Sequence, residues 1–174
     1  MNKIRIGSLL RPRPLVIAVL MGLLILQMIL GFASPARAVI RQLEEIPGQL
    51  LFQSRNTLRD QNGNAWQVVF FQRIKPDQSR QINLRLVDFP GTATFSHPQP
   101  LTVINKEQQW LAPDVFAEKA PAPNVGQYDL SEIIPEIPAG RALQLSLNLN
   151  EKQQLELRVP GAVVLEWQDV ANLK

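Results

Sequence analysis

The fold is decided by residues 60–74, which read Asp60-Gln61-Asn62-Gly63-Asn64-Ala65-Trp66-Gln67-Val68-Val69-Phe70-Phe71-Gln72-Arg73-Ile74. From residue 65 onward this stretch predicts a β-strand, because its apolar residues recur with a period of two. Those on one face are Trp66, Val68, Phe70 and Ile74. Val69 and Phe71 fall on the other face, which indicates a central strand covered on both sides. Ahead of the strand, Asn62-Gly63 suits the positive φ angles of a tight hairpin turn.

The same period of two continues along the chain. Residues 80–87 alternate between apolar and polar side chains, and residues 143–149 and 155–159 form a hairpin around Asn150-Glu151-Lys152. Weaker strand patterns cover residues 49–54, 92–96, 101–104 and 108–111. We therefore expect a mainly β fold, an antiparallel β-sandwich or barrel-like sheet of about seven to nine strands.

Two later segments depart from the strand pattern. Residues 112–140 contain five prolines and predict a long proline-rich loop. After Pro160, the residues Val163, Trp167 and Val170 share one face of a helix, whereas Val163, Leu165 and Trp167 would share one face of a strand. Of these two interpretations we favour a short C-terminal helix.

Residues 1–38 have the pattern of a Sec-type export signal. The positive charges near its start are Lys3, Arg5, Arg11 and Arg13. An apolar stretch follows from residue 15 to residue 30, and Ala36 and Ala38 are the small residues of a cleavage site. Cleavage after Ala38 leaves residues 39–174 as a single domain. Alternatively, the uncharged residues 14–36 are long enough to remain as a membrane anchor, which is the one route to the membrane that we expect.

Removal of the signal changes the charge of the chain. The signal segment carries five of the eighteen lysine and arginine residues and no acidic residue. After cleavage, thirteen basic side chains remain against fifteen acidic ones. This balance argues against a nucleic-acid partner. The chain has no cysteine, which excludes disulfides, thiolate nucleophiles and thiolate metal sites.

Signatures of catalysis, metal binding or cofactor binding are weak. His97 is the only histidine, and the chain has no Gly-x-Ser-x-Gly motif and no glycine-rich phosphate loop. Residues 60–64 resemble the start of a calcium loop, but Ala65 and Phe71 stand where glycine and a bidentate acid are required. We therefore assign no catalytic residue, no metal site and no cofactor, and expect a non-enzymatic protein.

The best candidates for contact with a partner lie in residues 120–129. The prolines of this segment lower the entropy cost of ordering it on binding, and Tyr128 with its polar neighbours offers an amphipathic surface. The candidate binding residues are Asn124, Gln127, Tyr128 and Asp129. Alternatively, this segment is a strap that Tyr128 ties across a sheet edge.

Several motifs resemble those of a known family. They are Leu58-Arg59-Asp60-Gln61-Asn62-Gly63-Asn64-Ala65-Trp66-Gln67, Leu84-Arg85-Leu86-Val87-Asp88-Phe89-Pro90-Gly91, Ala122-Pro123-Asn124-Val125-Gly126-Gln127-Tyr128-Asp129-Leu130 and Glu166-Trp167. The chain resembles an exported cyanobacterial family that is classed as a domain of unknown function. The resemblance implies an oxygenic phototroph and a location in the thylakoid lumen or periplasm. It brings no assigned activity and no catalytic residue.

Two functions follow as expectations. The first is an exported accessory protein that docks on a membrane complex such as a photosystem, with a protein as its partner. The alternative is a small-ligand-binding β domain, or a hydrolase, with a pocket that the sequence does not reveal.

Overall fold

The computed structural model describes residues 41–46, 48–150 and 153–174. The predicted export signal, its cleavage residues Ala36 and Ala38 and the candidate anchor at residues 14–36 lie outside the described residues. Within the described residues, no helix is both long and apolar enough to cross a membrane.

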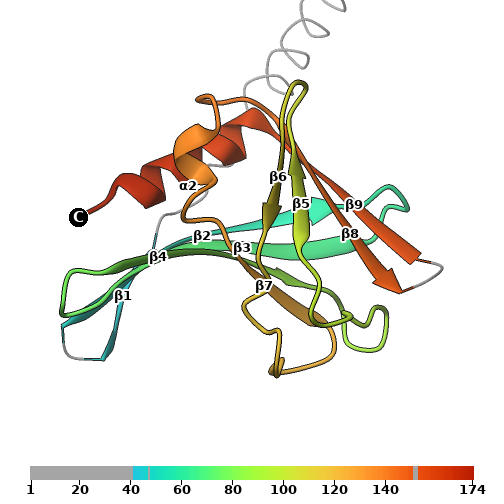
Figure 1. Ribbon diagram of the computed structural model, residues 1–174, viewed down its shortest axis with the longest axis horizontal. Coiled ribbons are helices and arrows are strands. Elements are labelled where there is room, and N and C mark those ends of the chain that lie inside the picture. Colours follow the sequence, from blue (N-terminus) through green and yellow to red (C-terminus); the bar gives the residue numbers. More distant parts are fainter. Residues whose placement is uncertain (1–40, 47, 151–152) are drawn as a thin grey trace, which may run out of the picture. The chain divides into compact units, whose positions relative to one another are not determined.

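The described chain forms two antiparallel sheets and a C-terminal helix, which confirms the mainly β prediction (Figure 1). The five-stranded sheet has the order β1 (Arg41–Ile46), β2 (Gln49–Arg59), β3 (Ala65–Ile74), β4 (Arg80–Val87) and β7 (Val125–Asp129). The four-stranded sheet has the order β6 (Gln109–Ala112), β5 (Leu101–Ile104), β8 (Leu143–Asn150) and β9 (Gln153–Val159). The helix, α2, spans Gly161–Asn172.

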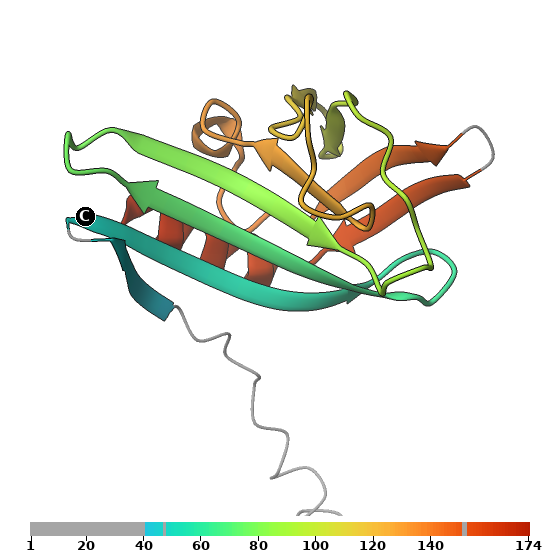
Figure 2. The same ribbon diagram turned by 90° about the horizontal axis from the view of Figure 1, so that it is seen from below.

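One face of β3 builds the main core. Trp66, Val68 and Phe70 are at most 1% exposed, as the alternation of the strand predicts. Helix α2 packs against this face through Trp167, whose ring stacks on Phe70 with centroids 5.2 Å apart. Figure 2 shows the helix running along the sheet on the side away from the viewer.

Polar contacts hold the middle and the C-terminal end of the helix on the sheet. The Ser54 hydroxyl donates to Glu166 Oε2 at 3.1 Å, and the Gln72 side-chain amide donates to the Leu173 carbonyl at 3.2 Å. The helix interpretation of the C-terminal segment is therefore confirmed. Val164, rather than Val163, is the fully buried valine of its first turn.

Three predicted segments differ from the structure in kind or by more than two residues. Residues 92–96 form no strand: Ala93 and Phe95 are buried alternately in the core, but the Phe95 N–H makes a single backbone bond, to Pro123 O, in place of a ladder. The segment 112–140 is not one continuous loop, because it contains β7 and a short 3₁₀ turn, Ile134–Glu136. The strand predicted at residues 49–54 extends to residue 59.

The predicted turn at Asn62-Gly63 joins β2 to β3 through hydrogen bonds to Asp60. One carboxylate oxygen accepts the backbone N–H groups of Asn62 and Asn64, and the other accepts the Asn64 side chain and Trp66 Nε1. Asp60 also forms an isolated bridge with Leu157 of β9, so the turn links the two sheets. Burial raises the pKa of Asp60, but hydrogen bonds from Asn64, Trp66 and Asn62 outweigh this effect and hold the pKa below its ordinary value.

We predict that Trp167→Ala destabilises the domain strongly, because it removes a large, fully buried side chain that stacks on Phe70. The free energy of unfolding should fall by about 3–5 kcal/mol. Urea unfolding followed by tryptophan fluorescence and circular dichroism measures it. Leu165→Ala, on the exposed side of the same helix, is the control and should cost about 1 kcal/mol or less.

We predict that Asp60→Asn destabilises the domain at neutral pH and has a smaller effect in acid. The pKa of Asp60 is lower in the folded chain than in the unfolded chain, so the stability it contributes is present above about pH 4. That stability is lost as the pH falls through the folded-state pKa. The urea midpoints of wild type and variant should differ more at pH 7 than at pH 2.5. An equal difference at both pH values would contradict the assignment.

Candidate functional site

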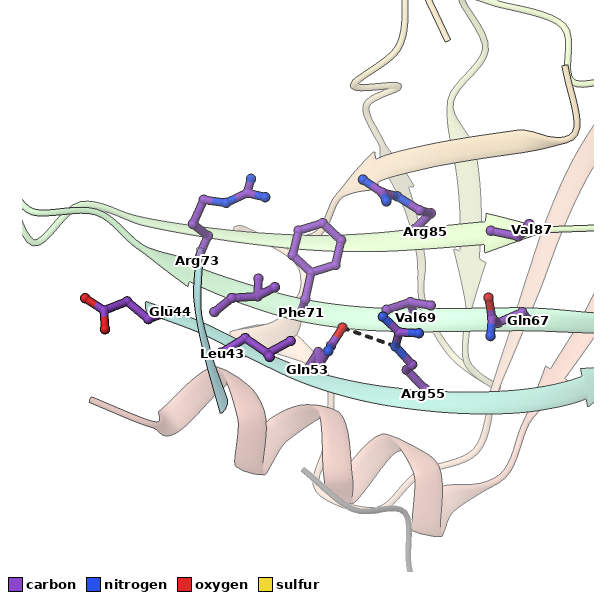
Figure 3. A pocket seen from close by; sticks show the side chains of 11 residues that line it. Leu43, Glu44, Gln53, Arg55, Gln67, Val69, Phe71, Arg73, Arg85 and Val87 are labelled. Carbon is purple, nitrogen blue, oxygen red and sulfur yellow. Dashed lines mark hydrogen bonds between the residues drawn. The ribbon is translucent and has the colours of Figure 1, made fainter. Parts of the chain in front are cut away.

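The outer face of the five-stranded sheet carries a groove of about 450 Å³ (Figure 3). It lies on the side of the sheet opposite α2, because its residues alternate with those that form the core. Its floor consists of Leu51, Val69 and Phe71, which are at most 9% exposed and form a hydrophobic cluster of their own. Both faces of β3 are therefore buried, the outer one beneath neighbouring side chains.

Strand register aligns two arginines across this floor. Val69 of β3 pairs with Arg55 of β2 on one side and with Arg85 of β4 on the other. We call Arg55, Val69 and Arg85 the arginine row. Directly paired residues share a face of the sheet, so both arginine side chains rise from the same surface.

Neighbouring side chains hold the arginines in position. Arg85 Nε and Nη2 donate to Gln127 Oε1 at 3.0 and 2.6 Å, and Arg55 Nε donates to Gln53 Oε1 at 3.3 Å. The guanidinium carbons of Arg73 and Arg85 lie 5.5 and 5.6 Å from the centre of the Phe71 ring, within cation–π range. Figure 3 shows Phe71 between these two arginines.

The groove is positively charged. Among the described residues that line it, three are arginine, one is an acid, Glu44, and the others are uncharged. Arginine stays protonated at every physiological pH and offers five N–H donors in a planar fork. This arrangement can bind a carboxylate or phosphate on an apolar support.

Of the four predicted binding residues, only Gln127 contacts a residue of the groove. Its side chain does not line the groove, but its Oε1 accepts the hydrogen bonds from Arg85. Tyr128 lies on the opposite face of β7 and is 1% exposed. Burial, and then the charge of Asp114, raise the pKa of Tyr128 well above its ordinary value, so it stays neutral.

The other two predicted residues make local contacts. The Asn124 side chain donates to the Asp88 carbonyl at 2.7 Å, and Asp129 Oδ1 accepts the Ser131 N–H at 2.9 Å. Both bonds fix the backbone at the ends of β7. Neither residue is among those that line the groove.

His97 has an acidic partner that sequence spacing did not indicate. Its Nδ1 lies 2.6 Å from Asp114 Oδ2, while Asp114 also accepts the backbone N–H groups of Gln99 and Phe116. His97 Nε2 is buried without a hydrogen-bond partner in the described structure. The adjacent Ser96 directs its hydroxyl to the Leu149 carbonyl. The pair therefore fixes the chain around Asp114 beside β7, where Asp114 bridges to Tyr128.

Sequence reasoning did not identify the groove residues Arg55, Arg73, Arg85 and Phe71. The alternation in β3 does place Val69, Phe71 and Arg73 on a common face, which was the available signal. Recognising the arginine row also requires the register of β2 and β4 against β3. Among the described residues, no cluster of histidine, aspartate and glutamate could hold a metal ion.

The fold and the groove define a two-sheet antiparallel β protein with an arginine-lined groove on one sheet face. The chain belongs to the DUF3122 family of proteins of unknown function, whose model matches residues 38–170. No curated protein and no solved structure matches the chain. The resemblance to a domain of unknown function is thus confirmed, while the cyanobacterial source and the export of the chain stay predictions.

We predict that Asp114→Ala lowers the free energy of unfolding by about 2–4 kcal/mol, because it removes the acceptor of three hydrogen bonds around a side chain that is 3% exposed. Chemical denaturation measures the change. Glu118→Ala, an exposed acid in the same segment, is the control and should change stability by about 0.5 kcal/mol or less. Equal effects of the two substitutions would show that Asp114 does not fix this segment.

Proposed function

We propose that this chain is an exported, non-enzymatic binding protein that docks on a protein partner in a membrane complex through the outer face of its five-stranded sheet. The observation that carries the proposal is the groove, in which arginines surround a buried apolar floor. Protein interfaces are enriched in arginine and combine an apolar centre with a polar rim. The partner surface should be acidic, because arginines outnumber acids among the described residues that line the groove.

The compartment in this proposal comes from the sequence. The charged start, apolar stretch and small residues Ala36 and Ala38 support export through the Sec pathway. The family resemblance supports the thylakoid lumen or periplasm, and a photosystem as an example of the membrane complex. If residues 14–36 remain uncleaved, the domain is anchored at the same membrane and its outer sheet face serves the same role.

A specific observation also favours a second candidate, the binding of a small anionic ligand. The groove volume of about 450 Å³ falls within the range of roughly 300–1,000 Å³ that small-molecule sites occupy. A carboxylate or phosphate on an apolar body would use the same arginines and the same floor. Cosedimentation with membranes separates the two candidates, because a small ligand gives no such association.

We predict that the purified domain cosediments with membranes of its native source and that Arg55→Glu weakens this association at least about tenfold, by replacing a charge-assisted contact with repulsion. Raising the salt concentration from about 50 to about 500 mM should weaken it as well. Arg141→Glu makes the same charge change at an exposed position outside the groove, and should bind as wild type does. Equal loss in both variants, or no association with membranes, would overturn the proposal.

A further inference from the structure

The spacing of charges along the groove indicates what kind of segment it binds. Arg55 and Arg85 flank Val69 on adjacent strands, so their Cα atoms are two strand spacings apart, about 10 Å. A carboxylate above Val69 would lie between two guanidinium groups and could bond to both. The bonds from Arg85 to Gln127 orient its side chain before a ligand arrives, which reduces the entropy cost of binding.

The opposite end of the groove is richer in apolar side chains. Leu43 of β1 pairs with Leu51 of β2, and Leu43 is 47% exposed. Leu51 pairs in turn with Arg73 of β3, whose guanidinium carbon lies 5.5 Å from the centre of the Phe71 ring, so this end has one arginine where the arginine row has two. Leu51 lies four residues from Arg55 on β2, so the leucine pair is about 14 Å from the arginine row along the strand. Figure 3 shows Leu43 at the end of the groove near Arg73 and away from Val87.

The one acid of the groove lies at the leucine end. Glu44 pairs with Leu50, five residues along β2 from Arg55, or about 17 Å. This distance exceeds the Debye length of about 8–10 Å at physiological salt, so Glu44 leaves the potential at the arginine row largely unchanged. Leu50 lies on the core side of β2, the Glu44 carboxylate accepts the Gly48 N–H at 3.2 Å, and Figure 3 shows it pointing away from Leu43, so Glu44 does not act on the leucine end either. The two ends of the groove therefore differ in their own side chains: two arginines flank Val69 at one end, and two leucines with one arginine lie at the other.

An extended peptide matches the distance of about 14 Å between the arginine row and the leucine pair. Residues i and i+4 of a strand point to the same side and lie about 14 Å apart. We propose that the groove binds an extended segment of the partner protein that carries an acidic residue four positions from an apolar residue. The acid lies between Arg55 and Arg85, and the apolar side chain lies on Leu43 and Leu51. This inference rests on the proposed docking function and adds the chemistry of the docked segment.

Three synthetic heptapeptides of otherwise threonine residues test the pattern by fluorescence polarisation. The first has glutamate at position two and leucine at position six and should bind. The second has glutamine in place of glutamate and should bind at least about tenfold more weakly, because a charge-assisted bond is lost. In the third the leucine moves to position five, on the opposite side of an extended chain, and affinity should fall about fivefold. Equal affinity of all three would overturn the pattern.

Matched variants of the protein test where the glutamate and the leucine of the peptide bind. Arg55→Gln should weaken the first peptide about tenfold and have little further effect on the glutamine peptide, because the two changes remove the same contact. Arg158→Gln, an exposed arginine of β9, is its control and should leave affinity unchanged. Leu43→Ser should weaken the first peptide, whereas Leu111→Ser, a 60% exposed leucine of β6, should not. Equal losses in variant and control would place the peptide elsewhere.

The peptide and membrane experiments fail separately. If the peptides show the predicted order but the domain does not associate with membranes, the groove recognises this pattern and the proposed membrane partner is wrong. If Arg55→Glu abolishes membrane association while all peptides bind equally, docking through the groove stands and the acid-to-apolar spacing is wrong. Saturable binding of acetate or inorganic phosphate at the arginines, without any preference among the peptides, would favour a small anionic ligand and overturn the inference.

Discussion

The pleat of β3 determines both faces of the five-stranded sheet. Alternate residues of one strand must serve opposite surfaces, so Phe70 stacks on the helix while its neighbours Val69 and Phe71 form the floor of the groove. A register slip of one residue would exchange these two sets. The hydrogen bonds that Asp60 accepts in the β2–β3 turn oppose such a slip. The turn that fixes the hydrophobic core therefore also aligns the arginine row.

Local patterns were sufficient for most of the fold. A half-buried strand shows a period of two in its apolar residues, and a tight turn has characteristic residues, so both can be read from contiguous sequence. This was enough to predict the strands at residues 65–74 and 80–87 and the hairpin at residues 143–159. The C-terminal helix was a choice between two periods, and burial of Trp167 and Val170 with Leu165 left 47% exposed matches the helical one. At residues 92–96 the same alternation predicted a strand wrongly, because a loop can bury every second residue without pairing with a neighbouring strand.

The candidate site could not be predicted in the same way, because its members are distant in sequence. Arg55 and Arg85 are thirty residues apart and become neighbours only through the register of β2, β3 and β4. Sequence alone shows that these positions are polar, which is equally typical of an ordinary solvated sheet face. The contact between His97 and Asp114 spans seventeen residues, across the β5–β6 hairpin. In each case the information lies in tertiary pairing, which a single strand's periodicity does not encode.

The proline-rich segment connects these two observations. Asp114 accepts the Phe116 N–H, Val115 donates its N–H to the Gln127 carbonyl, and the Phe116 ring lies 5.9 Å from the Arg85 guanidinium. Residues 114–116 therefore lie along β7, the edge strand that the second half of the predicted contact segment 120–129 forms. A strap that pairs with β7 also fixes Gln127, and Gln127 in turn holds Arg85. Because a preorganised arginine loses less entropy on binding an anion, the edge of the sheet contributes to affinity at the groove without touching the ligand.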